Sequence, residues 1–149
     1  MRSVIQRVDK AEIRVGRNCI SMIGKGILVF LGIQQGDEER DADYLTDKII
    51  HLRIFEDEKG KMNLSLLDIN GEMLIVSQFT LLADCSKGRR PSFTEAENPA
   101  RARALYDYFL SRSKEKVKCC TEGEFRAMMS VGLINNGPVT ILLDSRRRF

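Results

Sequence analysis

With 149 residues, 43% of them hydrophobic and 30% charged, the chain has the length and composition of one globular domain covering residues 1–149. Its net charge of +3 is too small to identify a nucleic-acid-binding protein. No apolar run approaches the roughly 20 residues that cross a bilayer, and the N-terminal residues lack the apolar core of a secretion signal. We therefore expect a cytoplasmic protein without membrane contact.

The N-terminal part of the chain is typical of β-strands. Residues 4–8 and 11–15 predict two strands, and the second segment alternates polar and apolar side chains. Two further strand-like segments, residues 19–23 and 27–33, flank Gly24-Lys25-Gly26. This arrangement predicts a hairpin in which glycine supplies a positive φ at the turn.

A buried strand and then a helix are predicted next. Residues 27–31 are apolar on both faces, as in the central strand of a sheet. Asp37 is expected to open the helix, with Glu38 and Glu39 in the first turn, where the helix dipole favours negative charge. A stripe of apolar residues at helical spacing supports this prediction: Ala42, Leu45, Ile49 and Leu52.

The rest of the chain predicts strands, one long loop and a second helix. Residues 83–97 are polar and rich in turn-forming residues, and a loop of this length is more often functional than idle. Asn98-Pro99 predicts a helix N-cap followed by proline, with the helix running to about Lys116. The strand-like segments are residues 53–55, 72–79, 117–120, 128–134 and 139–143. Together these elements predict an α+β fold: a curved, mostly antiparallel sheet or partly closed β-barrel with two main helices.

The residue types present exclude several kinds of catalytic site. His51 is the single histidine, so a metal site with two histidine ligands is impossible and a Ser-His-Asp triad is disfavoured. The four cysteines form no C-x-x-C pattern, and we interpret most of them as buried, reduced, structural residues: Cys19, Cys85, Cys119 and Cys120. We expect neither a metal nor a cofactor, and chemistry that depends on positioning and backbone dipoles.

Two short polar motifs beside apolar runs are the strongest candidates for a functional site. The first, Ser77-Gln78-Phe79-Thr80-Leu81, follows the apolar residues 73–76. In a strand, Gln78 and Thr80 would share one face, and Ser77 and Phe79 the other. Threonine and phenylalanine are also good strand residues, and Gln78 could simply bond a loop. Taken alone, the motif is explained by an ordinary strand.

The second motif, Asn135-Asn136-Gly137-Pro138-Val139-Thr140, precedes the apolar residues 141–143. A trans Gly137–Pro138 bond at a strand end is the ordinary interpretation of this dipeptide. Small polar groups and a Gly-Pro break at strand ends are also what a polar site on a rigid sheet requires. The residues by themselves leave both interpretations open.

The two motifs, at this separation in a chain this short, resemble the D-aminoacyl-tRNA deacylase (D-tyrosyl-tRNA deacylase) family. The resemblance extends through four other segments: residues 1–8, 52–55, 60–65 and 87–93. It implies the fold of that family and hydrolysis of the ester bond of D-aminoacyl-tRNA, with mischarged glycyl-tRNA as a further substrate. Two residues depart from the common family pattern, because Asn136 stands where aspartate is usual and Arg126 where glycine is usual.

The same resemblance assigns roles to the motif residues. The pocket that receives the terminal adenosine of the aminoacylated tRNA is implied to contain the catalytic segment Ser77, Gln78, Phe79 and Thr80. A Gly-cisPro dipeptide, Gly137-Pro138, is implied to enter the active site of the partner subunit in a homodimer and to exclude L-amino acids. The substrate pocket is implied to include Met129, Asn135, Val139 and Thr140.

Two basic clusters leave alternative functions open. Lys87, Arg89 and Arg90 lie within the 83–97 loop, and Arg146-Arg147-Arg148 lie near the C-terminus. We interpret them either as tRNA phosphate contacts or as solubilising charge. A small dimeric RNA-binding protein without catalytic activity would explain the basic loop but not the polar motifs. A hydrolase of free D-amino-acid esters would differ from the leading hypothesis in not requiring the tRNA body.

Overall fold

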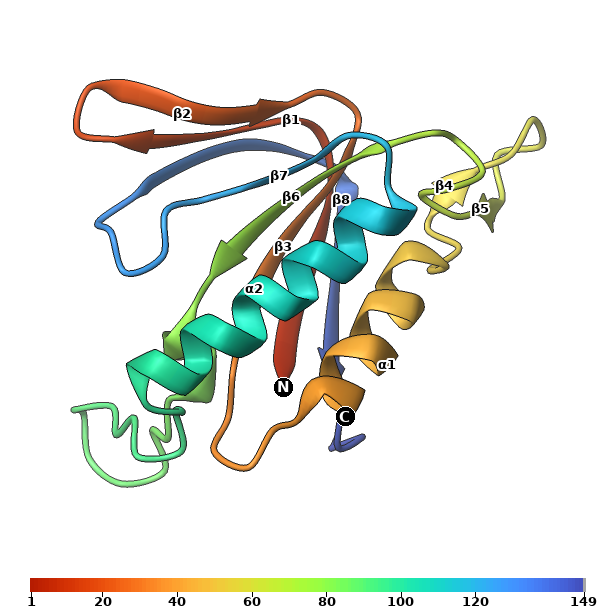
Figure 1. Cartoon of the computed structure of the whole chain (residues 1–149). Helices are drawn as coiled ribbons and strands as arrows, with labels where there is room; N and C mark the ends of the chain where they lie inside the picture. The colour runs from red at the N-terminus through yellow and green to blue at the C-terminus, as the bar shows by residue number, and fades with distance from the viewer. Residues whose placement is uncertain (149) are drawn as a thin grey trace.

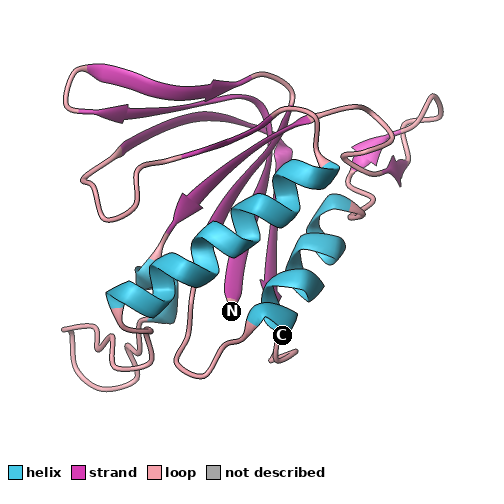
Figure 2. Ribbon diagram, viewed as in Figure 1, coloured by secondary structure: helices cyan, strands magenta, loops and turns pink. Residues whose placement is uncertain are grey.

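The computed structural model describes residues 1–148 and has an α+β architecture (Figure 1). The six-stranded sheet has the order β2-β1-β3-β6-β7, and β8 also pairs with β1. The helices α1 (Glu39–Ile50) and α2 (Pro99–Lys116) lie side by side across one face of this sheet, as Figure 2 shows. The strands are β1 Arg2–Val15, β2 Asn18–Ile23, β3 Gly26–Gly32, β4 Phe55–Glu56, β5 Met62–Leu64, β6 Glu72–Ser77, β7 Cys120–Glu122 and β8 Ser130–Asp144.

The prediction of a mostly antiparallel sheet with two main helices is confirmed. β1 pairs antiparallel with β2, β3 and β8, whereas β6 pairs parallel with both β3 and β7. β4 and β5 form a separate two-stranded hairpin. The second helix begins as expected, because the Asn98 side chain accepts a hydrogen bond from the Arg101 N–H and Pro99 is the first helical residue.

β1 is the strand around which the sheet is built, because it pairs along both of its edges. β8 follows almost the whole length of one edge, while β3 and then β2 follow the other. The predicted hairpin between residues 19–23 and 27–33 is therefore wrong, since these strands lie end to end along β1. Gly26 is required for the close approach of β3 to β6 and not for a turn, because a Cβ there would lie 1.9 Å from the carbonyl oxygen of Glu72 in β6. The true turn between β1 and β2 uses Gly16, with a φ of 60°.

Other element boundaries also differ from the predictions. Residues 4–8 and 11–15 belong to one continuous strand, β1. The first helix begins at Glu39 with Glu38 as its N-cap, so Asp37 lies before the helix. Gly137-Pro138 lies inside β8 and not at a strand end. The two strand differences arise because pairing between β1 and β8 continues across positions where the local sequence alone suggests a break.

The hydrophobic core lies between the sheet and the two helices. Phe109 and Tyr106 of α2 and Leu45 of α1 are fully or almost fully buried against β1, β3 and β6. The Tyr106 hydroxyl donates a hydrogen bond to the Ile75 carbonyl oxygen at 2.9 Å, which fixes α2 to the central strand β6. Burial of this phenol raises the pKa of Tyr106, so its hydroxyl stays a hydrogen-bond donor at neutral pH.

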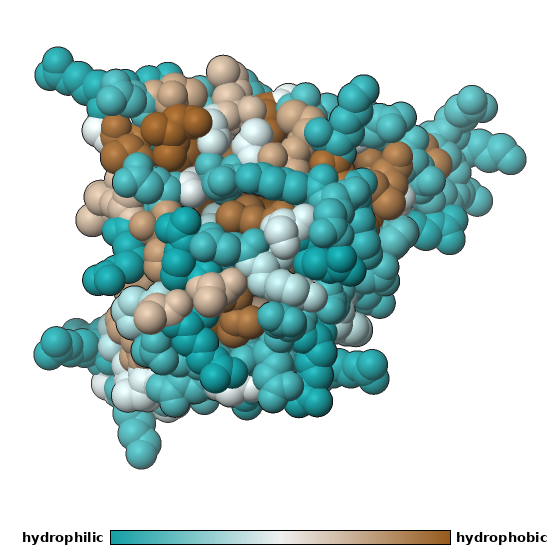
Figure 3. Space-filling view, in the orientation of Figure 1, coloured by the Kyte–Doolittle hydropathy of each residue, from teal (hydrophilic) through white to brown (hydrophobic). Residues whose placement is uncertain are grey.

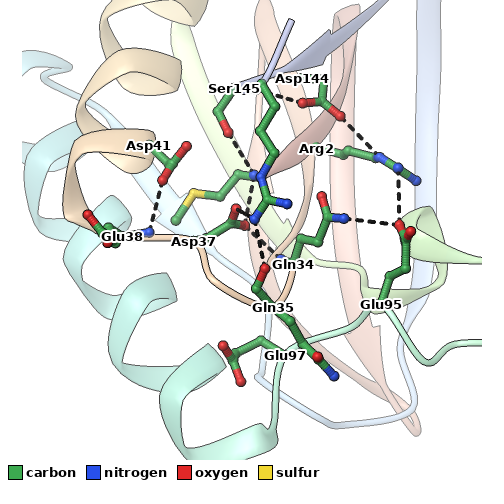
Figure 4. A network of polar contacts seen from close by, with 12 residues as sticks. Arg2, Gln34, Gln35, Asp37, Glu38, Asp41, Glu95, Glu97, Asp144 and Ser145 are labelled. Carbon is green, nitrogen blue, oxygen red and sulfur yellow. Dashed lines mark hydrogen bonds and ion pairs between the residues drawn. The ribbon is translucent and has the colours of Figure 1, made fainter. Parts of the chain in front are cut away.

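A buried ion pair joins the start of β1 to the segment before α1 (Figure 4). The Met1 ammonium group lies 2.7 Å from the Asp37 carboxylate and 2.8 Å from Ser145 Oγ, and Met1 and Asp37 are both fully buried. The Asp37 carboxylate also accepts a hydrogen bond from the Gln34 N–H at 2.7 Å and lies 3.1 Å from the Arg146 guanidinium. Asp37 thus connects β1, the end of β3 and the residues after β8.

Replacing Asp37 with alanine is expected to destabilise the fold strongly. Removing one member of a buried ion pair leaves an uncompensated charge, which typically costs about 3–5 kcal/mol. Urea unfolding should therefore show a decrease of that size in the free energy of unfolding. The matched control is Glu58→Ala, because Glu58 is exposed, and its effect should stay within about 0.5 kcal/mol. A decrease for Asp37→Ala as small as that of the control would contradict the structural role of the pair.

Glu95 attaches the end of the 83–97 loop to the sheet. Its carboxylate accepts hydrogen bonds from Gln34 Nε2 at 3.0 Å and from Arg2 Nη2 at 3.3 Å. The Glu97 N–H donates to the Ile33 carbonyl oxygen at 3.0 Å. Residues 95–97 are consequently held against the end of β3, and they form a fixed base for the rest of the loop.

The helix-bearing face of the molecule is largely hydrophilic, and apolar side chains show in several places, among them the β2 end and the side of the β4–β5 hairpin (Figure 3). Ile20 and Met22 of β2 are exposed, as are Leu133, Ile134 and Leu142 of β8.

Within residues 1–148, no helix has both the length and the apolar character needed to span a membrane.

Candidate active site

A cavity of about 730 Å³ opens where the parallel strands β3 and β6 end. Leu31 and Ile33 belong to the β3 side of its wall, and Val76 and Ser77 belong to the β6 side. The start of α2 and the segment from 125 to 129 enclose the cavity from the other sides. The carboxyl ends of parallel strands are a common location for ligand sites in α/β sheets, and the same geometry operates here in a mixed sheet.

The first motif contributes Ser77, Gln78, Phe79 and Thr80 to this cavity. β6 ends at Ser77, and a short 3-10 helix, Phe79–Leu82, begins directly afterwards, with Gln78 as its N-cap. The predicted alternation of side chains along a strand is therefore wrong beyond Ser77. Gln78 and Thr80 nevertheless meet, because the Gln78 side-chain amide donates a hydrogen bond to Thr80 Oγ1.

The backbone at the start of this 3-10 helix presents N–H groups without helical partners. The first hydrogen bond of the turn runs from the Leu81 N–H to the Gln78 carbonyl oxygen, so the N–H groups of Phe79 and Thr80 precede it. The Gln78 N–H donates a hydrogen bond to the Leu31 carbonyl oxygen at 2.8 Å, so it is not free to bind a ligand. Phe79 and Thr80 both line the cavity, so their N–H groups are candidates for binding a negatively charged oxygen.

The second motif forms a bulge in β8. Asn135 pairs with Val8 and Thr140 pairs with Gln6, so the four residues 136–139 stand opposite Arg7 alone. The Gly137–Pro138 peptide bond is cis, and both residues are exposed. Gly137 has a φ of +118°, in the region that favours glycine. The motif is therefore a protruding segment of an otherwise paired strand.

Side chains from β1 and β8 hold this bulge in one conformation. Arg7 is almost fully buried, and its Nε donates to the Asn136 carbonyl oxygen at 3.2 Å while its Nη1 donates to the Ile54 carbonyl oxygen at 2.6 Å. The Asn135 side chain accepts a hydrogen bond from the Val139 N–H at 3.0 Å and donates one to Thr140 Oγ1 at 3.0 Å. Arg7 was not predicted as a site residue from the sequence, because only the tertiary pairing of β1 with β8 places it beside the second motif.

The two motifs do not meet within one chain. None of residues 135–140 lines the cavity, although Met129, directly before β8, and Val131, at its start, do. Gly137 lies six positions after Val131, which in an extended strand is roughly 20 Å. Of the predicted substrate-pocket residues, Met129 alone lies with Ser77–Thr80, whereas Asn135, Val139 and Thr140 belong to the bulge.

The structure bears on both departures from the family pattern. The Asn136 side-chain amide donates a hydrogen bond to the Asp9 carboxylate at 2.8 Å, a contact in which an aspartate would repel its partner. Arg126 has a φ of +66°, which explains why glycine suits this position. Its side chain contributes a positive charge to the rim of the cavity.

Several wall residues were not predicted from the sequence. Phe125 lines the cavity, with its ring 5.6 Å from the Tyr106 ring and with the Arg103 guanidinium 5.5 Å above it. Gly123 allows Met129 to pack closely, because a Cβ there would lie 2.8 Å from the Met129 sulfur. The Asn98-Pro99 signal marked the start of α2 correctly but gave no indication that this helix end forms part of a cavity wall.

The remaining candidate residues lie outside the cavity. Lys87, Arg89 and Arg90 are exposed in the 83–97 loop, while Arg146 and Arg148 take part in ion pairs with Asp37 and Glu95. His51 lies at the C-terminal end of α1, hydrogen-bonded to the Asp47 carbonyl oxygen. Within residues 1–148, no cluster of three His, Cys, Asp or Glu side chains could hold a metal ion.

The cysteines are all free, but they are less buried than predicted. Cys19 and Cys85 are exposed, and Cys119 and Cys120 are partly buried, so the expectation that most of the thiols are buried is wrong. Burial raises the pKa of Cys120 to about 12, which keeps that thiol protonated and unreactive at neutral pH.

Comparison with known proteins identifies the family to which this chain belongs. A family model described as D-Tyr-tRNA(Tyr) deacylase matches residues 4–144, and the chain belongs to that family of hydrolases acting on aminoacyl-tRNA. A D-aminoacyl-tRNA deacylase of Syntrophus aciditrophicus (strain SB) is 60% identical over 149 residues, covering 100% of both chains. One of Halothermothrix orenii (strain H 168 / OCM 544 / DSM 9562) is 56% identical with the same coverage. The solved structure named c-Myc DNA Unwinding Element Binding Protein superposes with a TM-score of 0.92 and 41% identity, covering 97% of this chain and 98% of the other.

Proposed function

We propose that this protein hydrolyses the ester bond of D-aminoacyl-tRNA, releasing the free D-amino acid and the tRNA. The observation that carries the proposal is the cavity at the ends of β3 and β6, where the Ser77–Thr80 motif presents backbone N–H groups that have no partner among residues 1–148, in a chain of this family. The terminal adenosine and its aminoacyl group would occupy this cavity, whose volume of about 730 Å³ lies in the range typical of small-molecule sites.

In this mechanism the backbone performs the chemistry. An aminoacyl ester is already a reactive acyl donor, so a water molecule attacks its carbonyl carbon while the N–H groups of Phe79 and Thr80 bind the developing oxyanion. The substrate 2′-hydroxyl orients that water. The Thr80 hydroxyl accepts a hydrogen bond from Gln78 and has no titratable base in that contact, so it is a poor nucleophile.

We propose that the second motif acts on the partner subunit of a homodimer. Gly137 and Pro138 are exposed and lie roughly 20 Å along β8 from the cavity of their own chain. β8 also carries exposed apolar residues, Leu133, Ile134 and Leu142, and its edge away from β1 has no partner strand among the described residues. A second copy packed on this strand would cover the apolar surface and bring Gly137-Pro138 to the neighbouring cavity.

Chiral selection would then result from exclusion. The backbone of Gly137-Pro138 would form a wall beside the substrate α-carbon, against which an L side chain collides while a D side chain points away. Because exclusion requires no contact that recognises the substrate side chain, many D-amino acids should be accepted. Glycine has no side chain, so glycyl-tRNA should pass the same filter.

The direct test compares D-tyrosyl-tRNA, L-tyrosyl-tRNA and D-tyrosine methyl ester as substrates of the purified protein. Rapid release of D-tyrosine from tRNA, with slow release from the other two, is expected. Equal hydrolysis of the two tyrosyl-tRNAs would refute the exclusion mechanism. Equal hydrolysis of the free ester would favour a general D-amino-acid esterase, and binding of tRNA without hydrolysis would favour an RNA-binding protein.

Two substitutions at Thr80 distinguish the contribution of its hydroxyl to catalysis from that of its backbone N–H. Thr80→Ala removes the hydroxyl but keeps the N–H, so kcat should stay within about tenfold of wild type, less than the loss of an oxyanion donor causes. Thr80→Pro removes the N–H within the first helical turn, where that N–H donates to no helical carbonyl, and kcat should fall about 100-fold or more. Single-turnover deacylation of D-tyrosyl-tRNA measures both. A trapped acyl-Thr80 species, or a larger loss for alanine than for proline, would contradict the backbone mechanism.

A further inference from the structure

A pair of exposed aromatic rings connects the cavity to the 83–97 loop. The Phe79 and Phe93 rings lie 5.1 Å apart, in an edge-to-face arrangement with an interplanar angle of 65°. Phe79 is 57% exposed and Phe93 is 37% exposed, so both rings keep open surface. Phe79 lines the cavity and Phe93 does not, so the pair leads from the cavity rim to the loop.

The backbone around Phe93 is rigidly supported. Asp84 and Ser92 exchange two backbone hydrogen bonds, of 2.7 and 2.9 Å, which close residues 85–91 into a loop of their own. On the other side, the Ala96 N–H donates to the Phe93 carbonyl oxygen at 3.0 Å, and Glu95 is fixed to the sheet as described above. The position of Phe93 is therefore preorganised, which lowers the entropic cost of using it as a binding surface.

The closed loop next to Phe93 carries three cations that lack acidic partners. Lys87, Arg89 and Arg90 are exposed, and among the described residues no ion pair includes any of them. The neighbouring acids are engaged elsewhere. Glu95 pairs with Arg2 and Arg148, Glu97 pairs with Arg101, and Asp84 accepts a hydrogen bond from the Ser86 N–H. The loop thus presents net positive charge directly beside the aromatic pair.

Exposed aromatic rings beside unpaired cations are the arrangement that binds single-stranded nucleic acid. Bases stack on the rings while the phosphates contact the cations, and this recognition requires bases that are not paired in a duplex. A double-stranded stem would offer phosphates to the cations but no base face to the rings. The aromatic pair therefore favours an unpaired strand over a duplex.

We propose that Phe93 stacks a base of the unpaired 3′ end of tRNA, immediately preceding the terminal adenosine, while Lys87, Arg89 and Arg90 bind the phosphates of that strand. This inference rests on the proposed function, because it takes the terminal adenosine to occupy the cavity. Phe79 belongs to both the cavity and the aromatic pair, so a strand that leaves the cavity passes over Phe93 before it reaches the basic loop. Phe93 is thus a specificity residue that distinguishes an accessible 3′ end from a base-paired one.

The test measures binding of two uncharged RNA probes to the full-length protein by fluorescence anisotropy. One probe is an acceptor-stem minihelix with four unpaired 3′ nucleotides, and the other is the same stem with a blunt end. Phe93→Ala should raise the Kd of the overhang probe about tenfold, as expected for the removal of one base–aromatic stack, and change the Kd of the blunt probe much less. Phe93→Tyr, which retains a ring, should bind the overhang probe as wild type does.

A second variant tests the cations separately. Replacing Lys87, Arg89 and Arg90 together by glutamine should reduce the slope of log K against log salt by about 2 for the overhang probe, because each phosphate neutralised on a single strand contributes about 0.7 to that slope. Lys118→Gln is the matched control, because Lys118 is exposed beyond the opposite end of α2, and it should leave the slope unchanged. An unchanged slope in the triple variant would overturn this part of the proposal.

Catalysis distinguishes this inference from the proposed function. If wild-type protein fails to hydrolyse D-tyrosyl-tRNA, the proposed function is wrong. If it does hydrolyse that substrate, Phe93→Ala should raise KM for D-tyrosyl-tRNA far more than KM for D-tyrosyl-adenosine, which lacks the preceding nucleotides. Equal KM effects on the two substrates, or an equal decrease in affinity for the two RNA probes, would show that Phe93 supports the cavity and does not stack a base. Unchanged KM and Kd values would also overturn the inference.

Discussion

Gly137→Ala is expected to reduce kcat/KM for D-tyrosyl-tRNA at least about 100-fold, because the bulge is proposed to lie beside the substrate α-carbon and a misplacement of about 1 Å at a reacting centre has that effect. A Cβ at this position would lie 2.8 Å from Arg7 Nη2 and 2.9 Å from Val139 Cγ2. The φ of +118° is also a conformation that alanine rarely adopts. The bulge must therefore shift, and with it the backbone wall that is proposed to exclude L-amino acids. The ratio of D- to L-tyrosyl-tRNA hydrolysis should decrease as well.

Gly16→Ala is the matched control for this variant. Gly16 also has a positive φ, of 60°, but no atom lies within 4 Å of the Cβ that alanine would add. Both substitutions introduce backbone strain, so both should lower the melting temperature somewhat. Only Gly137→Ala should reduce kcat/KM. A folded Gly137→Ala protein with wild-type activity and selectivity would contradict the assigned role of the bulge.

Mixing two inactive variants should restore activity if the sites are composite. Ala127→Trp fills the cavity that Ala127 lines, whereas Gly137→Ala alters the bulge and leaves the cavity intact. In a dimer containing one chain of each kind, the intact cavity of the Gly137→Ala chain faces the intact bulge of the Ala127→Trp chain. Random pairing makes half of the dimers mixed, and each mixed dimer has one functional site of two, so about a quarter of wild-type activity should return.

This complementation is measured by deacylation assays on co-expressed variants carrying different affinity tags. Each variant alone should be nearly inactive, and the doubly tagged dimer should reach about half of wild-type activity per protein. Light scattering on each variant checks that dimers form. Mixed dimers without activity would show that each chain uses its own bulge. A wild-type protein that is monomeric and fully active would exclude a composite site.

Local sequence signals predicted the elements that depend on neighbouring residues. Asn98-Pro99 gave the start of α2 correctly, because an N-cap side chain and a proline at the first helical position act within one turn. The apolar residues 27–31 predicted the central strand β3 for a similar reason. For the sheet around these elements, the sequence predicted only that it is mostly antiparallel, and not which strands pair with each other.

Pairing over long separations was not predictable in the same way. The Gly24-Lys25-Gly26 segment looks like a hairpin turn, but β2 and β3 both pair with β1, and Gly26 is required by its contact with Glu72 in β6. The same limitation applies to the site. Ser77–Thr80 could be identified by its motif, whereas Arg7 and Phe125 acquire their positions only when distant segments pack together.

The long ladder between β1 and β8 has a consequence for how the protein folds. Arg2 pairs with Asp144 and Arg14 pairs with Ser130, so the central strand completes its second edge only after nearly the entire polypeptide has been synthesised. Contacts between such distant residues must overcome a large loop-closure entropy, which slows folding. A nascent chain would therefore expose the unpaired edge of β1 until late in translation, when chaperones could protect it from aggregation.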